Sequence, residues 1–486
     1  MNPLRFAYVK QHGVLVQVET DFVKVIYHRP PQLSVLTELR RELRQPIQLE
    51  AVSSAVFNET LVKIYETKSS QALQMAEDLG ESLSLSDLVH ELPKAEDLLE
   101  KQDDAPIIRL LNALLSEAIK EGASDVHIET FEDCVKIRFR VDGILREVLE
   151  PPRILAPLII SRIKIMAKLD IAEKRLPQDG RITLRIGGRS VDVRVSTMPT
   201  NHGERAVLRL LDKQNAHLDL ADLGMEEKTL QLLRSMITRP HGIILVTGPT
   251  GSGKTTTLYA ALTLLNDHCR NILTVEDPIE YDLAGIGQTQ VNLKTNMTFA
   301  RGLRAILRQD PDVVMIGEIR DLETAQIAIQ ASLTGHLVLS TLHTNSAIGA
   351  ITRLNDMGVE PFLLASSLIG VLAQRLVRLL CPHCKRPQEA LEKECALLGV
   401  SSDHPPVIYH PVGCDHCRHG YMGRSGVYEL IAMDDTLCSM THDQTSEQHM
   451  RKYARSLFPS LRQDGCMRVL KGETSLEEVL RVTNED

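Results

Sequence analysis

Aromatic residues are scarce in this sequence of 486 residues, which has no tryptophan and only 3% Phe, Trp and Tyr together. A core must therefore be built mainly from Leu, Ile and Val, in a chain that is 43% apolar and 24% charged. These proportions are typical of a globular protein of about three domains. The net charge of −9 also leaves little of the basic surface that phosphate binding requires, so we expect no nucleic acid as the main partner.

Long hydrophobic runs are absent as well. Residues 1–10 contain no apolar core long enough for a signal peptide. Residues 324–352 carry no Asp, Glu, Lys or Arg, but polar side chains interrupt them, and the uncharged segment 361–374 is too short to span a bilayer. We therefore expect a soluble protein that contacts a membrane only through a partner.

The cysteine pattern indicates metal binding in a reducing compartment and not a disulfide framework. Two C-x-x-C pairs, with 29 residues between them, together complete a tetrahedral Zn²⁺ site that has no open position. Such a site is structural and would stabilise an insertion that lacks its own core. The alternative is a set of unmetallated thiols. The predicted ligands are Cys381, Cys384, Cys414 and Cys417. The other five cysteines show no such pairing.

Residues 243–258 indicate a nucleotide site. Residues 243–247 are uniformly apolar or β-branched and predict a buried strand, and the next eight residues fit G-x-x-x-x-G-K-[ST] at every position. Glycines permit the close turns with which backbone N–H groups wrap a phosphate. We expect the lysine to reach the β- and γ-phosphates and the threonine after it to hold Mg²⁺, at a helix N-terminus that favours negative charge. The alternative is a glycine-rich turn without a ligand. The predicted nucleotide-binding residues are Gly248, Pro249, Thr250, Gly251, Ser252, Gly253, Lys254, Thr255 and Thr256.

Further strand and helix alternation predicts a parallel sheet in this part of the chain. The expected strands are 243–247, 271–275, 313–317 and 337–341. In such sheets ligands gather beyond the carboxyl ends of the strands, and this rule sorts the acidic residues.

Four acidic residues follow the expected strands at the ligand end, and one precedes its strand. Glu276, Asp277 and Glu280 come after 271–275, and Glu318 comes after 313–317, whereas Asp312 lies at the wrong end. We therefore predict that Glu318 orients Mg²⁺ or the attacking water, and that Glu276 and Asp277 face the phosphates. The alternative for each is a loop carboxylate or a helix cap.

Basic residues near these strands are less decisive. His343 lies just beyond strand 337–341 at the nucleotide end, and His336 lies at the start of that strand. We favour His343 for catalysis, although a lone histidine is usually structural. Arg301, Arg304 and Arg308 are spaced to line one side of a helix, where they could sense phosphate or pair with acids.

The first 217 residues contain two further units. Residues 1–100 predict a small α+β docking module with strands at 14–18 and 22–27, a helix near 70–79 and an acidic linker from 84 to 104; the alternative is a stabilising appendage. Residues 101–217 open with a helix that ends at Gly122, followed by a hairpin of 135–141 and 144–148.

Three arginines lie on outward strand faces of this second unit: Arg194, Arg205 and Arg209. Such residues could act on a neighbouring subunit's γ-phosphate. The alternative is that they are solvated or form internal salt bridges. The remaining unit, 218–486, carries the nucleotide motif, an expected helix at 361–380, the cysteine insertion at 381–417 and C-terminal helices at 430–486.

Four motifs in order give the chain a resemblance to secretion ATPases. Residues 248–255, 272–281, 307–320 and 334–343 look like the Walker A, aspartate, Walker B and histidine boxes of that superfamily. With the tetracysteine motif, the chain is similar in particular to the ATPases of bacterial type II secretion, the E component. The resemblance covers about residues 105–430.

The resemblance implies an α/β fold. Its parts are a RecA-like P-loop ATPase domain, a mixed α/β (PAS-like) domain before it, a small N-terminal α+β docking module and a tetracysteine zinc insertion. It also implies a homohexamer that hydrolyses ATP with Mg²⁺. Arg194 and Arg209 match the family's basic positions, Glu318 its Walker B glutamate, and His336 and His343 its histidine box.

Similar proteins power pseudopilus assembly and protein export from the cytoplasmic face of the bacterial inner membrane. The resemblance implies contact with the cytoplasmic domain of the L component through residues 1–100, and with the platform protein, the F component. Two alternatives stay open. The tetracysteine insertion also occurs in type IV pilus assembly ATPases, and a nucleic-acid motor is the alternative from a different class, although no aromatic and basic stretch supports it.

Overall fold

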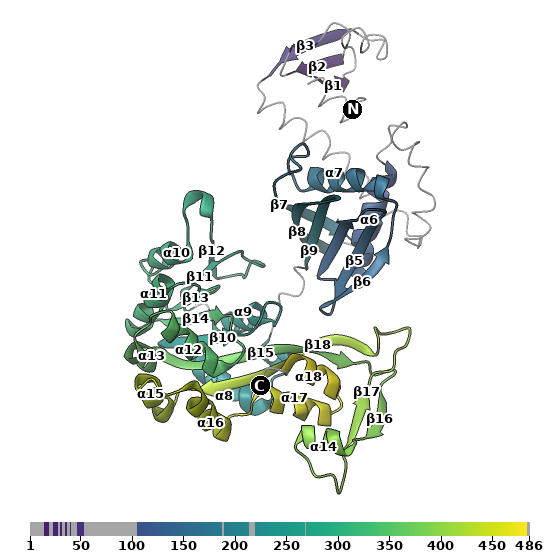
Figure 1. The fold of residues 1–486 in the computed structure, drawn as a ribbon. Helices are drawn as coiled ribbons and strands as arrows, with labels where there is room; N and C mark the ends of the chain where they lie inside the picture. The colour runs from purple at the N-terminus through teal and green to yellow at the C-terminus, as the bar shows by residue number, and fades with distance from the viewer. Residues whose placement is uncertain are drawn as a thin grey trace. The chain divides into compact units, whose positions relative to one another are not determined.

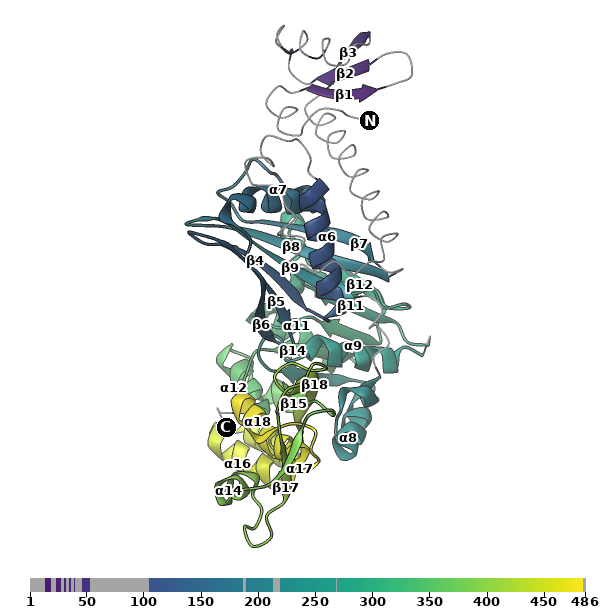
Figure 2. The same cartoon turned by 90° about the vertical axis from the view of Figure 1, so that its right-hand side faces the viewer.

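The computed structural model describes residues 14–18, 23–27, 30–31, 35, 39, 46–52, 105–186, 189–212, 219–267 and 269–483. Contacts within the chain divide it into two compact units, Met1–Lys213 and Gln214–Asp486. This division falls four residues before the boundary expected after residue 217. Figures 1 and 2 show both units from two sides.

The first described elements form a three-stranded sheet. Its strands are β1 (Val14–Val18), β2 (Val23–Tyr27) and β3 (Ile47–Ala51), with β1 antiparallel and β3 parallel to β2. The side chains of Val14, Val16 and Val25 share a small core with Val35 and Leu39. The two strands expected here are confirmed to within a residue. The helix expected at 70–79 and the linker at 84–104 lie outside the described residues.

The described residues from 105 to 212 form a six-stranded antiparallel sheet, two α-helices and one 3-10 helix. In chain order the elements are α6 (Ala105–Lys120), β4 (Asp125–Thr130), β5 (Val135–Val141), β6 (Ile144–Leu149), η1 (Arg153–Leu155), α7 (Ala156–Met166), β7 (Gln178–Ile186), β8 (Arg189–Thr200) and β9 (Gly203–Asp212). The strand order is β6-β5-β4-β9-β8-β7. Apolar side chains of α6, α7 and one face of the sheet form a single core, and the opposite face carries the charged residues of the alternating strands.

The expected helix and hairpin of this unit are confirmed. The apolar stripe of α6 is buried against the sheet, and the chain turns away at Gly122 with a positive φ of 65°. Asp142 and Gly143 both have positive φ, as a two-residue hairpin between twisted strands requires. Thus local sequence was sufficient to predict this region.

The second unit is built on a seven-stranded sheet of order β12-β11-β13-β14-β10-β15-β18. Every neighbouring pair is parallel except β15 with β18. Its first elements are η3 (Leu220–Leu223), α8 (Glu227–Ile237), β10 (Gly242–Thr247), α9 (Lys254–Leu265), β11 (Ile272–Glu276), β12 (Gly287–Gln290), η4 (Leu293–Thr295), α10 (Phe299–Ile306), β13 (Val313–Ile316), α11 (Leu322–Leu333), β14 (Leu337–Leu342), α12 (Ala347–Asp356) and α13 (Pro361–Ser367).

The remaining elements complete the sheet, the cysteine insertion and the C-terminal helices. They are β15 (Leu368–Leu380), β16 (Arg386–Glu389), α14 (Glu392–Leu398), β17 (Val407–His410), β18 (Tyr421–Ala432), α15 (Asp435–His442), α16 (Glu447–Leu457), α17 (Leu461–Leu470) and α18 (Leu476–Thr483). β16 and β17 pair with each other inside the insertion. Apolar cores cover both faces of the seven-stranded sheet, which explains the apolar character of its fully buried strands β10, β13 and β14.

All four strands expected in the parallel sheet are confirmed. They lie side by side in the order β11, β13, β14 and β10, so their carboxyl ends meet at one edge of the sheet. The loops that follow these four strands are therefore neighbours, which is the arrangement that the sorting of acidic residues assumed.

The helix expected at 361–380 is wrong. The chain is helical only in α13, and a strand of 13 residues, β15, follows directly and pairs with β10 and β18. The first six residues of β15, 368–373, are all buried and form an apolar run without the alternation that marks a half-buried strand. Periodicity alone could not distinguish it from a buried helix.

The prediction that Arg301, Arg304 and Arg308 line one side of a helix is correct only in part. Arg301 and Arg304 lie in α10, which ends at Ile306, so Arg308 falls in the turn beyond it. Arg304 pairs with Glu323 at 2.7 Å, and Arg301 donates a hydrogen bond to the Asn296 carbonyl. These contacts favour the alternative in which such arginines pair within the domain.

Candidate nucleotide site and metal centre

The phosphate-binding motif forms a loop between β10 and α9. Thr247 ends the strand, and Lys254 begins the helix. Gly251 and Gly253 have φ of 80° and 86°, values that side chains other than glycine rarely adopt. The loop therefore ends at a helix N-terminus whose free backbone N–H groups favour an anion.

The residues of this loop fit a bound nucleotide phosphate. The Ser252 side chain is buried, and its hydroxyl has no hydrogen-bond partner among the residues that the structure describes. Thr255 is exposed in the first turn of α9, where its hydroxyl could serve as an oxygen ligand for Mg²⁺. The loop thus offers donors for phosphate and one oxygen ligand for the metal.

Lys254 is almost fully buried beneath the loop. Its Nζ donates hydrogen bonds to the carbonyl oxygens of Gly248 (2.8 Å) and Pro249 (3.0 Å). Burial lowers the pKa of Lys254 to about 8, although the charge of Glu318 opposes this shift; Arg375 adds to it. Lys254 is therefore held inside the loop, and its pKa of about 8 lies only slightly above neutral pH.

Glu318 and His343 meet at the carboxyl ends of adjacent strands. Glu318 follows β13 by two residues, His343 directly follows β14, and the His343 Nε2 lies 3.2 Å from Glu318 Oε2. The Thr341 hydroxyl donates to the Gly317 carbonyl at 2.7 Å and fixes the backbone before Glu318. Arg320 pairs with the other carboxylate oxygen of Glu318.

The two acids after β11 have different environments. Glu276 is 3% exposed, and its carboxylate accepts hydrogen bonds from Thr274 (2.6 Å), Gln288 (3.0 Å) and the Tyr259 hydroxyl. Burial and the Glu276 charge raise the pKa of Tyr259 well above its usual range. Asp277, by contrast, is exposed at the edge of the sheet. Of this pair, Asp277 has the accessible carboxylate.

Asp312 and His336 lie at the opposite edge of the sheet. Asp312 precedes β13 and accepts a hydrogen bond from the Asn271 backbone at 2.7 Å. His336 precedes β14, and its Nδ1 lies 2.8 Å from the Ala331 carbonyl. The structure thus separates these two residues from Glu318 and His343.

Three residues that lie at the nucleotide end of the sheet were not identified from the sequence. Arg320 lies in the same motif as Glu318, and its position two residues further along was the available signal. Gln374 and Arg375 lie in β15 next to the phosphate loop. The incorrect helix at 361–380 concealed their placement.

The candidate arginines of the first unit lie on the charged face of the six-stranded sheet. Arg194 and Arg209 are directly opposite each other on β8 and β9. Arg209 Nε donates to the buried Asp125 at 3.0 Å, while 56% of the arginine side chain is exposed. Arg205 pairs with Glu129 at 2.8 Å. Arg205 and Arg209 therefore both form internal ion pairs, and the Arg209 side chain still extends into solvent.

The four predicted cysteine ligands form one cluster. All four sulfur atoms lie within 4.8 Å of one another. The Cys381–Cys414, Cys384–Cys417 and Cys414–Cys417 Sγ separations are 3.9, 3.5 and 3.6 Å. A tetrahedral zinc site with Zn–S bonds of about 2.3 Å has sulfur separations of about 3.8 Å. The cluster therefore fits Zn²⁺, and backbone N–H groups of Gly413 and Cys414 donate to its sulfurs at 3.3 Å.

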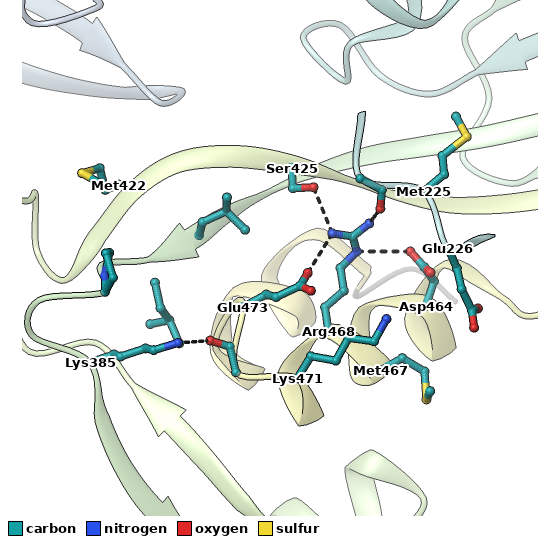
Figure 3. A pocket seen from close by; sticks show the side chains of 15 residues that line it. Met225, Glu226, Lys385, Met422, Ser425, Asp464, Met467, Arg468, Lys471 and Glu473 are labelled. Carbon is teal, nitrogen blue, oxygen red and sulfur yellow. Dashed lines mark hydrogen bonds and ion pairs between the residues drawn. The ribbon is translucent and has the colours of Figure 1, made fainter. Parts of the chain in front are cut away.

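A cavity of about 560 Å³ lies beside the first cysteine pair (Figure 3). Arg468 reaches across it and donates to Ser425 (2.9 Å) and Glu473 (3.1 Å), and Lys385 donates to the Gly472 carbonyl at 2.7 Å. None of the predicted nucleotide-binding residues lines this cavity. Its charged groups instead connect the cysteine insertion to the turn after α17, and α17 to β18.

Two family models match the chain. The model for the type II/IV secretion system protein covers residues 100–481, and that for an N-terminal domain of GSPII protein E covers residues 3–65. The first match spans most of the chain and both large sheets. The chain belongs to the type II/IV secretion system protein family.

Full-length relatives support this membership. The chain is 61% identical over 484 residues to the type II secretion system protein E of Pseudomonas aeruginosa, covering 99% of this chain and 96% of that protein. It is 60% identical over 486 residues to the type II secretion system ATPase E of Vibrio cholerae, covering 99% and 97% of the two chains.

A solved structure supports the fold of the ATPase. The crystal structure of the pilus retraction motor PilT with bound ADP matches with a TM-score of 0.53 and 27% identity, covering 76% of this chain and 95% of that one. The expected α/β fold with a RecA-like P-loop domain and a tetracysteine cluster is confirmed, and the expected small N-terminal module coincides with a match to a domain of GSPII protein E. The chain is a P-loop ATPase of the secretion family, and this family uses nucleotide with Mg²⁺.

Proposed function

We propose that this family member hydrolyses ATP as a homohexamer and powers pseudopilus assembly and protein export by type II secretion. The supporting observation is the convergence of the phosphate loop, Glu318 and His343 at one edge of the sheet, in a chain about 60% identical to a type II secretion system ATPase. ATP would bind at this edge, where the loop offers backbone N–H groups and Lys254.

The roles of the site residues follow from their positions. Lys254 would contact the β- and γ-phosphates, and Thr255 would hold Mg²⁺, which offsets the charge of the phosphates. Glu318 would accept a hydrogen bond from the attacking water and orient it, while His343 holds the second carboxylate oxygen. Asp277 is accessible for a further contact at the metal side.

We assign the arginines a role across a subunit interface. The γ-phosphate gains negative charge on its oxygens during hydrolysis, and an arginine supplied by another subunit stabilises that charge. The exposed part of Arg209 and its neighbour Arg194 suit such a contact. Hydrolysis would then depend on the ring and would move one subunit against the next.

The partners and the location belong to the same proposal. The match of residues 3–65 to an N-terminal domain of GSPII protein E supports docking of residues 1–100 on the cytoplasmic domain of the inner-membrane L component. The platform F component is the second partner, and nucleic acid is not one. None of the helices in the described ranges is long and apolar enough to cross a bilayer. We place the protein on the cytoplasmic face of the inner membrane through these partners, and the type II secretion names of its relatives support this location.

The cysteine cluster is the structural part of the site. We assign Zn²⁺ to Cys381, Cys384, Cys414 and Cys417, because four thiolates with no open position hold a metal without activating water. A type IV pilus assembly ATPase remains the second candidate, since that class also carries the insertion. The names of the full-length relatives favour secretion.

Hydrolysis rates of the purified full chain test the function. We expect activity that rises steeply with protein concentration, as rings assemble, and rises again with the cytoplasmic part of the L component. Single-stranded DNA serves as the comparison. Stimulation by DNA and not by the L component would favour a nucleic-acid motor, and full activity of a dilute single chain would contradict the ring.

A further inference from the structure

The strand β15 continues past the end of β10 and reaches the phosphate loop. In the parallel pairing of the two strands, Thr247, the last residue of β10, is opposite Ala373. The next residue of β15, Gln374, therefore lies level with Gly248, the first residue of the loop. Gln374 is 2% exposed.

Gln374 lies against both the phosphate loop and the first turns of α9. Its Oε1 accepts a hydrogen bond from Thr257 Oγ1 at 2.7 Å, within the first turns of α9. A Cβ atom at Gly253 would lie 2.8 Å from Gln374 Nε2, and one at Gly248 would lie 2.5 Å from the Gln374 carbonyl oxygen. Gly248 is thus required for the close approach of the β15 backbone, and Gly253 leaves room for the side-chain amide of Gln374.

Arg375 connects Gln374 to the loop after β14, the loop that begins with His343. Its guanidinium donates to the Gln374 carbonyl at 3.1 Å and to the Asn345 carbonyl at 2.9 Å. Asn345 lies two residues after His343 in the loop that follows β14. Arg375 therefore joins the backbone of Gln374 to the loop after β14, while the side chain of Gln374 contacts Thr257 in α9.

We propose that Gln374 is a positioning residue for the phosphate loop. Its hydrogen bond to Thr257 fixes the start of α9 against β15, and this fixes the places of Lys254 Nζ and the Thr255 hydroxyl. The inference rests on the proposed nucleotide function, because its consequence is nucleotide affinity. If Gln374 only filled space, replacing it would lower the stability of the fold. Nucleotide affinity would then fall only as far as the loss of stability explains.

A double-mutant cycle separates positioning from packing. The variants are Gln374→Leu, Thr257→Val and the double variant, with affinity for a fluorescent ADP analogue measured with Mg²⁺ and stability measured by urea unfolding. Each single variant should bind the analogue about tenfold more weakly, because each removes the hydrogen bond that fixes the start of α9. Each should also be less stable, because one buried polar partner is left unsatisfied. The double variant should regain stability, because two apolar groups replace both partners, but its affinity should stay as low as that of the single variants.

Two further variants control for general effects. Thr257→Ser keeps the hydroxyl and should bind like the wild type. Thr441→Val removes another buried threonine hydroxyl, which donates to the Leu437 carbonyl in α15, and should lower stability without changing affinity. If Gln374→Leu fails to fold, the comparison of Thr257→Val with Thr257→Ser makes the same test.

The outcomes distinguish this inference from the proposed function. Wild-type affinity in Gln374→Leu or in Thr257→Val would overturn the positioning role, as would a double variant that regains affinity together with stability. An equal loss of affinity in Thr441→Val would do the same. If the wild type itself does not bind the ADP analogue, the proposed function fails.

Discussion

Lys254 combines burial with a charge that the phosphates need. Its Nζ is held by two carbonyl oxygens of its own loop, and burial brings its pKa to about 8. A nucleotide anion favours the protonated form. The lysine therefore carries its charge over the neutral range but loses it in mildly alkaline solution, in contrast to an exposed lysine.

Nucleotide affinity should consequently fall as the pH rises above about 8. Above this pH the free protein must take up a proton on Lys254 before it can bind, which costs roughly tenfold in affinity for each further pH unit. Titration of a fluorescent ADP analogue between about pH 7 and about pH 9.5 measures this fall in affinity. Lys254→Ala is the control: it should bind weakly, and its affinity should not show the same dependence on pH. A constant wild-type affinity over this range would contradict the assignment.

Glu318 and Asp312 lie at opposite ends of the same strand, β13, and provide a matched pair. Glu318→Gln should lower the hydrolysis rate by about a hundredfold or more and leave ADP affinity nearly unchanged, because the carboxylate acts on the water and not on the bound diphosphate. Asp312→Asn should leave both nearly unchanged. Steady-state rates and ADP titrations of the two variants decide this, and equal rates in both would remove the assignment of Glu318.

At the scale of elements, β15 and β18 connect the cysteine cluster to the sheet. β15 leads directly into Cys381, and β18 begins four residues after Cys417 and pairs antiparallel with β15. The chain between them holds only short strands and one short helix. The pairing of β15 with β18 joins the two ends of this insertion, and a metal held by the four thiolates would fix the two C-x-x-C turns to each other.

Replacing Cys381 and Cys384 with Ser should release one zinc ion for each chain and destabilise the insertion, with easier proteolysis between the two cysteine pairs. Elemental analysis and limited proteolysis measure these effects. Cys269→Ser is the control, since Cys269 is exposed and lies outside the cluster. Unchanged zinc content in the double variant would show that other residues bind the metal.

At the scale of the whole molecule, the nucleotide-binding residues and the candidate arginines belong to different compact units of the chain. Arg194 and Arg209 are in the first unit, and Lys254 and Glu318 are in the second. In a ring, each nucleotide site could contact the arginines of its own chain or those of a neighbouring chain. Only mixed assemblies can separate these two cases.

Mixing Arg209→Ala subunits with Glu318→Gln subunits should restore part of the hydrolysis that each variant lacks alone. If the arginine acts across an interface, some sites in a mixed ring combine an intact Glu318 with an intact Arg209. Rates at several mixing ratios measure the recovery, and differently tagged subunits confirm that mixing occurred. Mixed rings without recovery would assign the arginine to its own subunit.

The sequence by itself determined the phosphate loop, four strands of the sheet around it and the cysteine cluster. In each case the chemistry depends on residues close together in the chain: glycines and a lysine at fixed spacing in 248–255, and two C-x-x-C turns. The rule that ligands gather at carboxyl ends of parallel strands then placed Glu318 and His343 together, and Asp312 and His336 apart.

Only the tertiary structure decided what surrounds these groups. Residues 368–380 form a strand because β10 and β18 pair with them on both sides. The apolar sequence of this segment does not by itself specify those partners. Burial of the Glu276 carboxylate against Tyr259 and Gln288, and the contact of Gln374 with Thr257, depend in the same way on residues far apart in the chain. Such contacts follow from packing between strands and helices, which the pattern along one segment cannot specify.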